Sequence, residues 1–201
     1  MIADWPPSEP FDEREPWPPL LPSRAAVGFV AVGIEGLGNA RAMAALWSDQ
    51  ALDDAHRYYQ AARQCAWANW AIERAEDWSP SGEQFSGWVE AMWMAGCRLL
   101  ISAHLAQQWV RLADPDVAEV PGLRRARNAI EHLHEADVDS DQVIATTMVG
   151  DDGKERAWDI QRLPEGHLIF GMGKKPLESV FDAVSLEEIV AFAREHGNRR
   201  T

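Results

Sequence analysis

The sequence predicts a mainly α protein, in which an up-down helical bundle is followed by a small C-terminal β hairpin or meander and a terminal helix. Two long segments carry apolar residues at helical spacing, and they predict the bundle. Short apolar runs separated by turn residues follow, and a helix-capping pattern stands near the end. We place the bundle at residues 24–142 and the β/α appendage at residues 143–201.

The first 23 residues are expected to form an extended arm. They hold seven of the 12 prolines together with five acidic residues. Proline lacks a backbone donor, and the segment has little apolar surface to bury, so it cannot fold by itself.

The two long segments predict helices over about 40–77 and about 84–112. A break is expected in the first near residues 48–50, where Ser48 or Asp49 could cap a second part. The second begins after a Ser-Pro-Ser-Gly turn at residues 79–82. Tryptophans at helical spacing on both are expected to form core or a subunit interface: Trp67, Trp70, Trp88, Trp93 and Trp109.

The rest of the chain predicts shorter elements. Pro121 is a good first-turn residue and predicts a third helix over about 122–137. Strands are expected at 145–149, 156–161 and 167–170, separated by Gly- or Pro-containing turns. Ser185 and Glu188 form a capping-box pattern that starts a last helix, which runs to about His196.

Charge and cysteine content exclude several function classes. The formal net charge of −13 argues against broad coating of nucleic acid, which requires a basic surface. Cys65 and Cys97 fit no zinc or disulfide pattern and are expected to be buried, reduced thiols. No secretory signal and no membrane span are recognisable, so we expect a cytoplasmic protein.

The segment from Leu123 to Glu135 carries the most chemistry. Its apolar residues fall into one helical stripe, while Asn128 and His132 share the opposite face with Arg124 and Arg125. Such a set could act on a phosphodiester, because histidine can transfer a proton near neutral pH and arginine can neutralise developing phosphate charge. RNA supplies its own 2′-hydroxyl nucleophile, so no metal and no cofactor are expected.

The residues from Arg127 to His132 resemble the motif of the HEPN superfamily. That motif is an arginine, a polar residue, three further residues and a histidine, late in a helical bundle. Here Asn128 is the polar residue, and Glu131 before His132 also resembles many members. The resemblance covers roughly residues 40–137 and implies a HEPN-like bundle.

The resemblance also implies an activity and partners. HEPN domains typically form homodimers whose motif helices line one cleft, and catalytic members cleave RNA without a metal, many as toxins with a partner antitoxin protein. His132 would then be the acid or base, Arg127 would stabilise the scissile phosphate, and Asn128 would orient them. Four neighbours are candidate substrate-binding residues: Arg124, Arg125, Glu131 and His134.

Two other interpretations of the sequence remain open. The same scaffold could bind a ligand or partner protein without performing chemistry, with Arg127 simply paired to Glu131 and His132 solvated. Alternatively, the tryptophan-rich face could serve assembly alone. The ribonuclease hypothesis requires His132 to lie in a cleft with Arg127 able to turn toward it.

Overall fold

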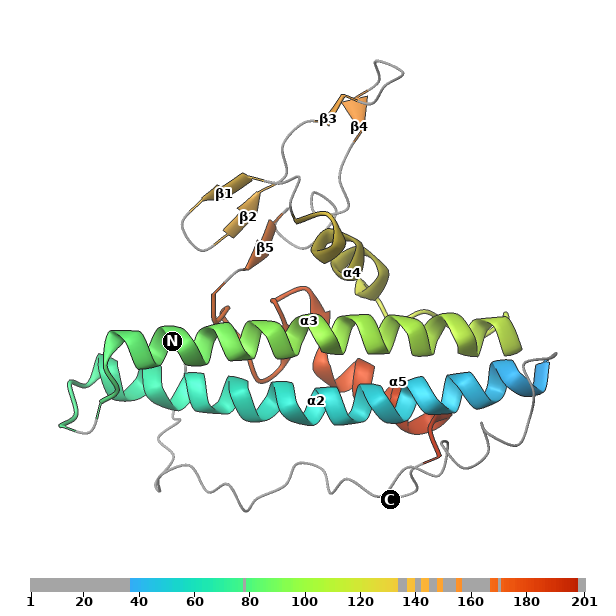
Figure 1. The fold of residues 1–201 in the computed structure, drawn as a ribbon, viewed down its shortest axis with the longest axis horizontal. Helices are drawn as coiled ribbons and strands as arrows, with labels where there is room; N and C mark the ends of the chain where they lie inside the picture. The colour runs from blue at the N-terminus through green and yellow to red at the C-terminus, as the bar shows by residue number, and fades with distance from the viewer. Residues whose placement is uncertain are drawn as a thin grey trace.

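A computed structural model describes residues 37–77, 79–133, 137–139, 142–144, 148–149, 155–156, 167–169 and 171–198. The protein is mainly helical, as the sequence predicts, with small antiparallel hairpins and a terminal helix. Two long helices, α2 (Leu37–Glu73) and α3 (Gly82–Ala113), lie side by side and antiparallel, and the shorter helices described below pack against this pair (Figure 1).

Small residues at the contact allow α2 and α3 to pack along most of their length. On α2 the buried positions include Ala51, Ala55, Ala62 and Cys65. Of the eleven buried residues of α3, six follow one another at alternating four- and three-residue steps, the spacing of a coiled-coil seam: Met92, Gly96, Leu99, Ala103, Ala106 and Val110. A capping box begins α3, in which the Ser81 hydroxyl accepts from the Gln84 N–H and Gln84 reaches back to the Ser81 N–H.

The predicted break in the first helix is wrong, because α2 runs unbroken through residues 48–50. Ser48 and Asp49 are buried, and Asp49 Oδ1 accepts the backbone N–H of Asn198 at 3.1 Å. A Cβ at Gly197 would lie 2.8 Å from the same oxygen, so glycine allows this close approach. Asp49 therefore binds the residues after the terminal helix and does not cap a new one.

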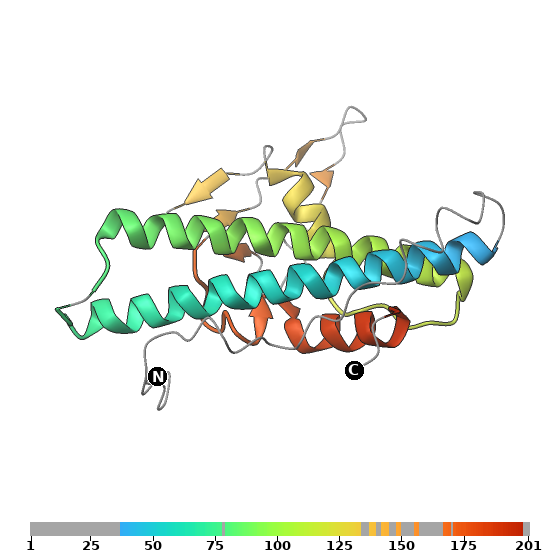
Figure 2. The ribbon, with the colours of Figure 1, turned by 60° about the horizontal axis from the view of Figure 1, so that its bottom comes forward.

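The terminal helix α5 (Leu186–His196) begins where the capping pattern predicts, since the Ser185 hydroxyl accepts from the Glu188 N–H. It lies against α2 and, less extensively, against α3 (Figure 2). Its buried residues Ile189, Val190 and Ala193 belong to the same core as the two long helices. The division of the chain at residue 143 stays a prediction, although residues 180–193 share this core.

A tight turn between strands β6 (Ser179–Val180) and β7 (Val184–Ser185) is inserted into the bundle. Phe181 and Asp182 both have positive φ angles, of 56° and 53°, which is costly for a bulky residue such as Phe181. The Phe181 ring is buried against Trp93 and Gly96. Burial of this ring offsets the backbone strain, and the Tyr58 hydroxyl adds a 2.8 Å hydrogen bond to the Ser179 carbonyl.

The third helix, α4 (Leu123–Glu131), is shorter than the predicted 122–137, and Asp137 begins strand β1 (Asp137–Asp139). β1 pairs antiparallel with β2 (Gln142–Ile144), which pairs with β5 (His167–Ile169). β3 (Met148–Val149) and β4 (Glu155–Arg156) form a second antiparallel pair. The expected strand at 167–170 is thus confirmed, and only parts of those at 145–149 and 156–161 are described as strand.

The described residues also include both cysteines and the tryptophans of the long helices. Cys65 and Cys97 are free and buried as predicted, and burial raises the pKa of each thiol to about 12. The five tryptophans that were expected to form core or an interface are half-buried. No helix within the described ranges is long and apolar enough to cross a membrane. The proline-rich arm at 1–23 lies outside the described residues.

Candidate functional site

The start of α4 is fixed by contacts to α3 and to the β6–β7 turn. The backbone N–H of Val120 donates to Oε1 of the buried Gln107 at 2.7 Å, and Arg111 pairs with Glu119. Gly122 stands at the N-cap with φ 76°, and a Cβ there would lie only 2.8 Å from the Ala183 carbonyl oxygen. Glycine is required here both by the left-handed backbone and by the close approach.

The two faces of α4 differ as the sequence predicts. Leu123, Ala126 and Ala129 are buried, while Ile130 and Leu133 are half-buried and pack against the core. The candidate residues divide by exposure, with Arg127 and Asn128 half-buried and four others exposed: Arg124, Arg125, Glu131 and His132. Three arginines of a strongly acidic protein therefore gather on one nine-residue helix.

Arg127 is held on the helix by its neighbours. Its Nη1 donates to Asn128 Oδ1 at 3.1 Å and pairs with the Glu131 carboxylate one turn later. The ion pair between Arg127 and Glu131 is the one that the non-catalytic hypothesis predicts. A phosphate that binds Arg127 therefore has to compete with Glu131.

His132 lies at the end of α4 and not within the helix, which is a consequence of the early helix end. It forms the C-cap with φ −102° and ψ 17°, and its N–H still bonds to the Asn128 carbonyl at 3.2 Å. Because this bond closes the last turn, Asn128 and His132 follow one another on the same face, as expected. The predicted neighbour His134 lies outside the described residues.

A second histidine, His104 of α3, lies beneath this cluster and was not among the predicted site residues. It is 4% exposed, and its Nδ1 has no hydrogen-bond partner among the described residues. Burial lowers the pKa of His104, and the Arg127 cation lowers it further. The Glu131 carboxylate of α4 and the Glu119 carboxylate, which precedes α4, oppose this effect and raise the pKa of His104.

The sequence does contain a signal for the polar residues of α3 that contact the α4 region and that the prediction missed. His104, Gln107 and Arg111 are three and four residues apart, so they share one side of α3. Polar side chains in one line on a helix indicate a polar contact, and here Gln107 and Arg111 contact the segment that leads into α4. The identity of that partner does not follow from α3 alone.

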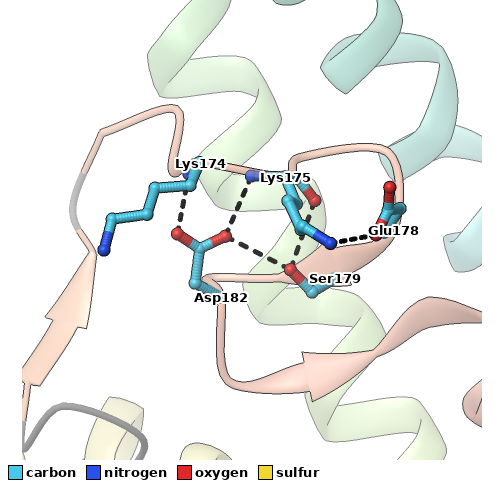
Figure 3. Close-up of polar contacts among 5 residues, drawn as sticks. All are labelled: Lys174, Lys175, Glu178, Ser179 and Asp182. Carbon is cyan, nitrogen blue, oxygen red and sulfur yellow. Dashed lines mark hydrogen bonds and ion pairs between the residues drawn. The ribbon is translucent and has the colours of Figure 1, made fainter. Parts of the chain in front are cut away.

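A further polar cluster stabilises the β6–β7 region (Figure 3). The Asp182 carboxylate accepts the backbone N–H groups of Lys174 and Lys175, at 2.7 and 3.2 Å, and the Ser179 hydroxyl at 3.2 Å. Lys175 Nζ in turn donates to Glu178 at 2.8 Å. These bonds connect segments of one loop, so we interpret the cluster as structural.

A hollow of about 790 Å³ lies beside this loop and is lined by residues of β6, β7 and α5, with no contribution from α4. Within the part of the chain that the structure describes, no three His, Cys, Asp or Glu residues lie close enough to hold a metal ion. Neither a protein-family model, nor a curated protein, nor a solved structure matches this chain.

Proposed function

We propose that the protein is a HEPN-like, metal-independent endoribonuclease that acts as a homodimer, with its active site on the outer face of α4. The observation that supports this most is the gathering of Arg124, Arg125 and His132 as exposed groups beside half-buried Arg127 and Asn128. Arginine suits phosphate because its planar guanidinium offers paired donors.

The proposed reaction uses the 2′-hydroxyl of the RNA. His132 takes the proton of this hydroxyl, the 2′-oxygen attacks phosphorus, and the bond from phosphorus to the 5′-oxygen breaks. The departing 5′-oxygen takes up a proton from water, and His132 afterwards returns its proton to water. Arg127 stabilises the charge on the phosphate after the phosphate has replaced Glu131 as its partner. The products are a 2′,3′-cyclic phosphate and a 5′-hydroxyl.

Cleavage of end-labelled RNA in the presence of EDTA tests the proposal. We expect the wild-type protein to leave cyclic-phosphate ends, and we expect His132→Ala to lower the rate by about 10²-fold or more, the usual contribution of an acid–base group. His56→Ala, which removes a histidine from α2, should retain the wild-type rate. Equal rates for wild type and His132→Ala would overturn the assignment of His132.

A second candidate function is a module that binds RNA or a phosphorylated ligand without cleaving it. The observation that favours it is the pairing of Arg127 with Glu131 and Asn128, which occupies the guanidinium that catalysis would need. On this candidate, a folded protein binds RNA in the same assay and leaves it intact.

A further inference from the structure

Helix α3 has apolar residues on two opposite faces. One face carries the six buried residues at seam spacing described above. A helix that packs on one side only is expected to be polar on its outer side, whereas α3 exposes Met94, Ile101 and Leu112, to 49%, 41% and 61%. An apolar outer face indicates that a further partner covers it.

The outer face also has the spacing of a coiled-coil seam. Its residues follow one another at alternating four- and three-residue steps, which keeps them in one line along a helix. From the middle of α3 to its end this line consists of Met94, Arg98, Ile101, Leu105, Gln108 and Leu112. All six are exposed or half-buried. We name this line the outer seam.

The order of residues in the outer seam indicates which partner fits it. Read from either end, the seam is apolar, polar, apolar, apolar, polar, apolar, with its centre near residue 103. An antiparallel second copy would therefore set Ile101 against Leu105 and Met94 against Leu112. It would also set the Arg98 guanidinium, a donor, against the Gln108 carbonyl oxygen, an acceptor.

A parallel copy does not fit equally well. It would bring Arg98 against Arg98 of the other protomer, and two like charges at one contact are unfavourable. We infer that the outer seam of α3 is an antiparallel homodimer interface with a two-fold axis near residue 103. The inference is argued from α3 alone and goes beyond the proposed function, which does not say which surface pairs.

The dimer would have a consequence for α4. A two-fold axis between antiparallel helices lies in the plane of the interface, so an element on one side of α3 stays on that side in both protomers. His104 is adjacent in sequence to the centre of the outer seam, and charged residues of α4 influence its pKa. The two α4 helices would therefore flank the same side of the dimer near its axis.

Sedimentation velocity of the full chain over a range of concentrations tests the interface. We expect reversible dimers for the wild type, and an increase of at least tenfold in the dimer dissociation constant for Ile101→Lys. Ile72→Lys is the matched control, because Ile72 of α2 is exposed to 40% and Ile101 to 41%. Circular dichroism confirms that both variants remain helical.

Disulfide formation tests the orientation. Arg98→Cys and Gln108→Cys proteins should cross-link when mixed, but neither should cross-link alone. In the antiparallel dimer two copies of residue 98 are offset by ten residues, about 15 Å along the axis, which no disulfide can span. The buried native thiols give a low background, for which the wild type is the blank.

Several results would overturn the inference. These are a wild type that stays monomeric up to about 1 mM, equal weakening of the dimer by Ile72→Lys and Ile101→Lys, or cross-linking of each cysteine variant with itself. A dimer that passes these tests but cleaves no RNA removes the proposed function and leaves the interface intact. A monomer that cleaves RNA removes the interface and the homodimer of the proposed function, and it leaves the ribonuclease activity of α4 intact.

Discussion

At the scale of single residues, the environment of His104 determines how it responds to pH. Burial and Arg127 lower its pKa below the ordinary value, so the folded protein holds it neutral where the unfolded chain already binds a proton. The folded state therefore has its full stability above about pH 6.5 and loses part of it as the pH falls below that value.

We expect His104→Gln to remove this part of the pH dependence. In urea titrations between pH 7.5 and pH 5, the free energy of unfolding of the wild type should fall, by up to about 1.4 kcal/mol per pH unit from this group. The fall should be shallower in His104→Gln. Gln107→Met is the control, since loss of its bond to Val120 should lower stability equally at every pH. Parallel pH profiles for the wild type and His104→Gln would contradict the argument.

At the scale of elements, glycines decide how closely the helices and the β6–β7 turn can approach. Gly96 faces the buried Phe181 ring, and an added Cβ would lie 2.7 Å from its Cζ. Gly87 stands on the same helix with nothing within 4 Å of an added Cβ. The two positions thus separate the steric role of glycine from its low helix propensity.

Thermal unfolding of Gly96→Ala and Gly87→Ala tests this difference. We expect Gly96→Ala to lower stability by about 1–3 kcal/mol, because the Phe181 ring or the β6–β7 turn must move. Gly87→Ala should raise stability by about 0.5–1 kcal/mol through better helix propensity. A stabilising Gly96→Ala would show that the ring does not fill the space beside this glycine.

The sequence predicts the elements better than it predicts their ends and contacts. The helical spacing of apolar residues and the capping residues located α2, α3 and α5, because both signals depend on residues that are close together in the sequence. The break expected at Ser48 and Asp49 was wrong because these polar residues are buried by contacts with residues almost 150 positions later. For the same reason the turn that buries Phe181 was not anticipated.

At the scale of the whole molecule, α4 is the element where positive charge is concentrated on a protein of net charge −13. The sequence predicted the apolar stripe of this helix, of which Leu123 and Ala126 are buried, but it extended the helix beyond Glu131. It also missed His104, because the contact between α3 and α4 depends on tertiary packing. The proposed dimer would set two such faces on one side of the molecule.

The contact between α4 and RNA is the central claim, and both the ribonuclease and a module that binds RNA without cleaving it require this contact. The most direct test is to follow the arginine Nε–Hε and histidine ring NMR signals while adding a mixed-sequence 2′-O-methyl oligonucleotide, which lacks the nucleophile and cannot be cleaved. We predict that signals of Arg124, Arg125, Arg127 and His132 shift, and that added salt reverses the shifts. Binding that leaves these four unmoved, or no binding at low salt, would contradict the account.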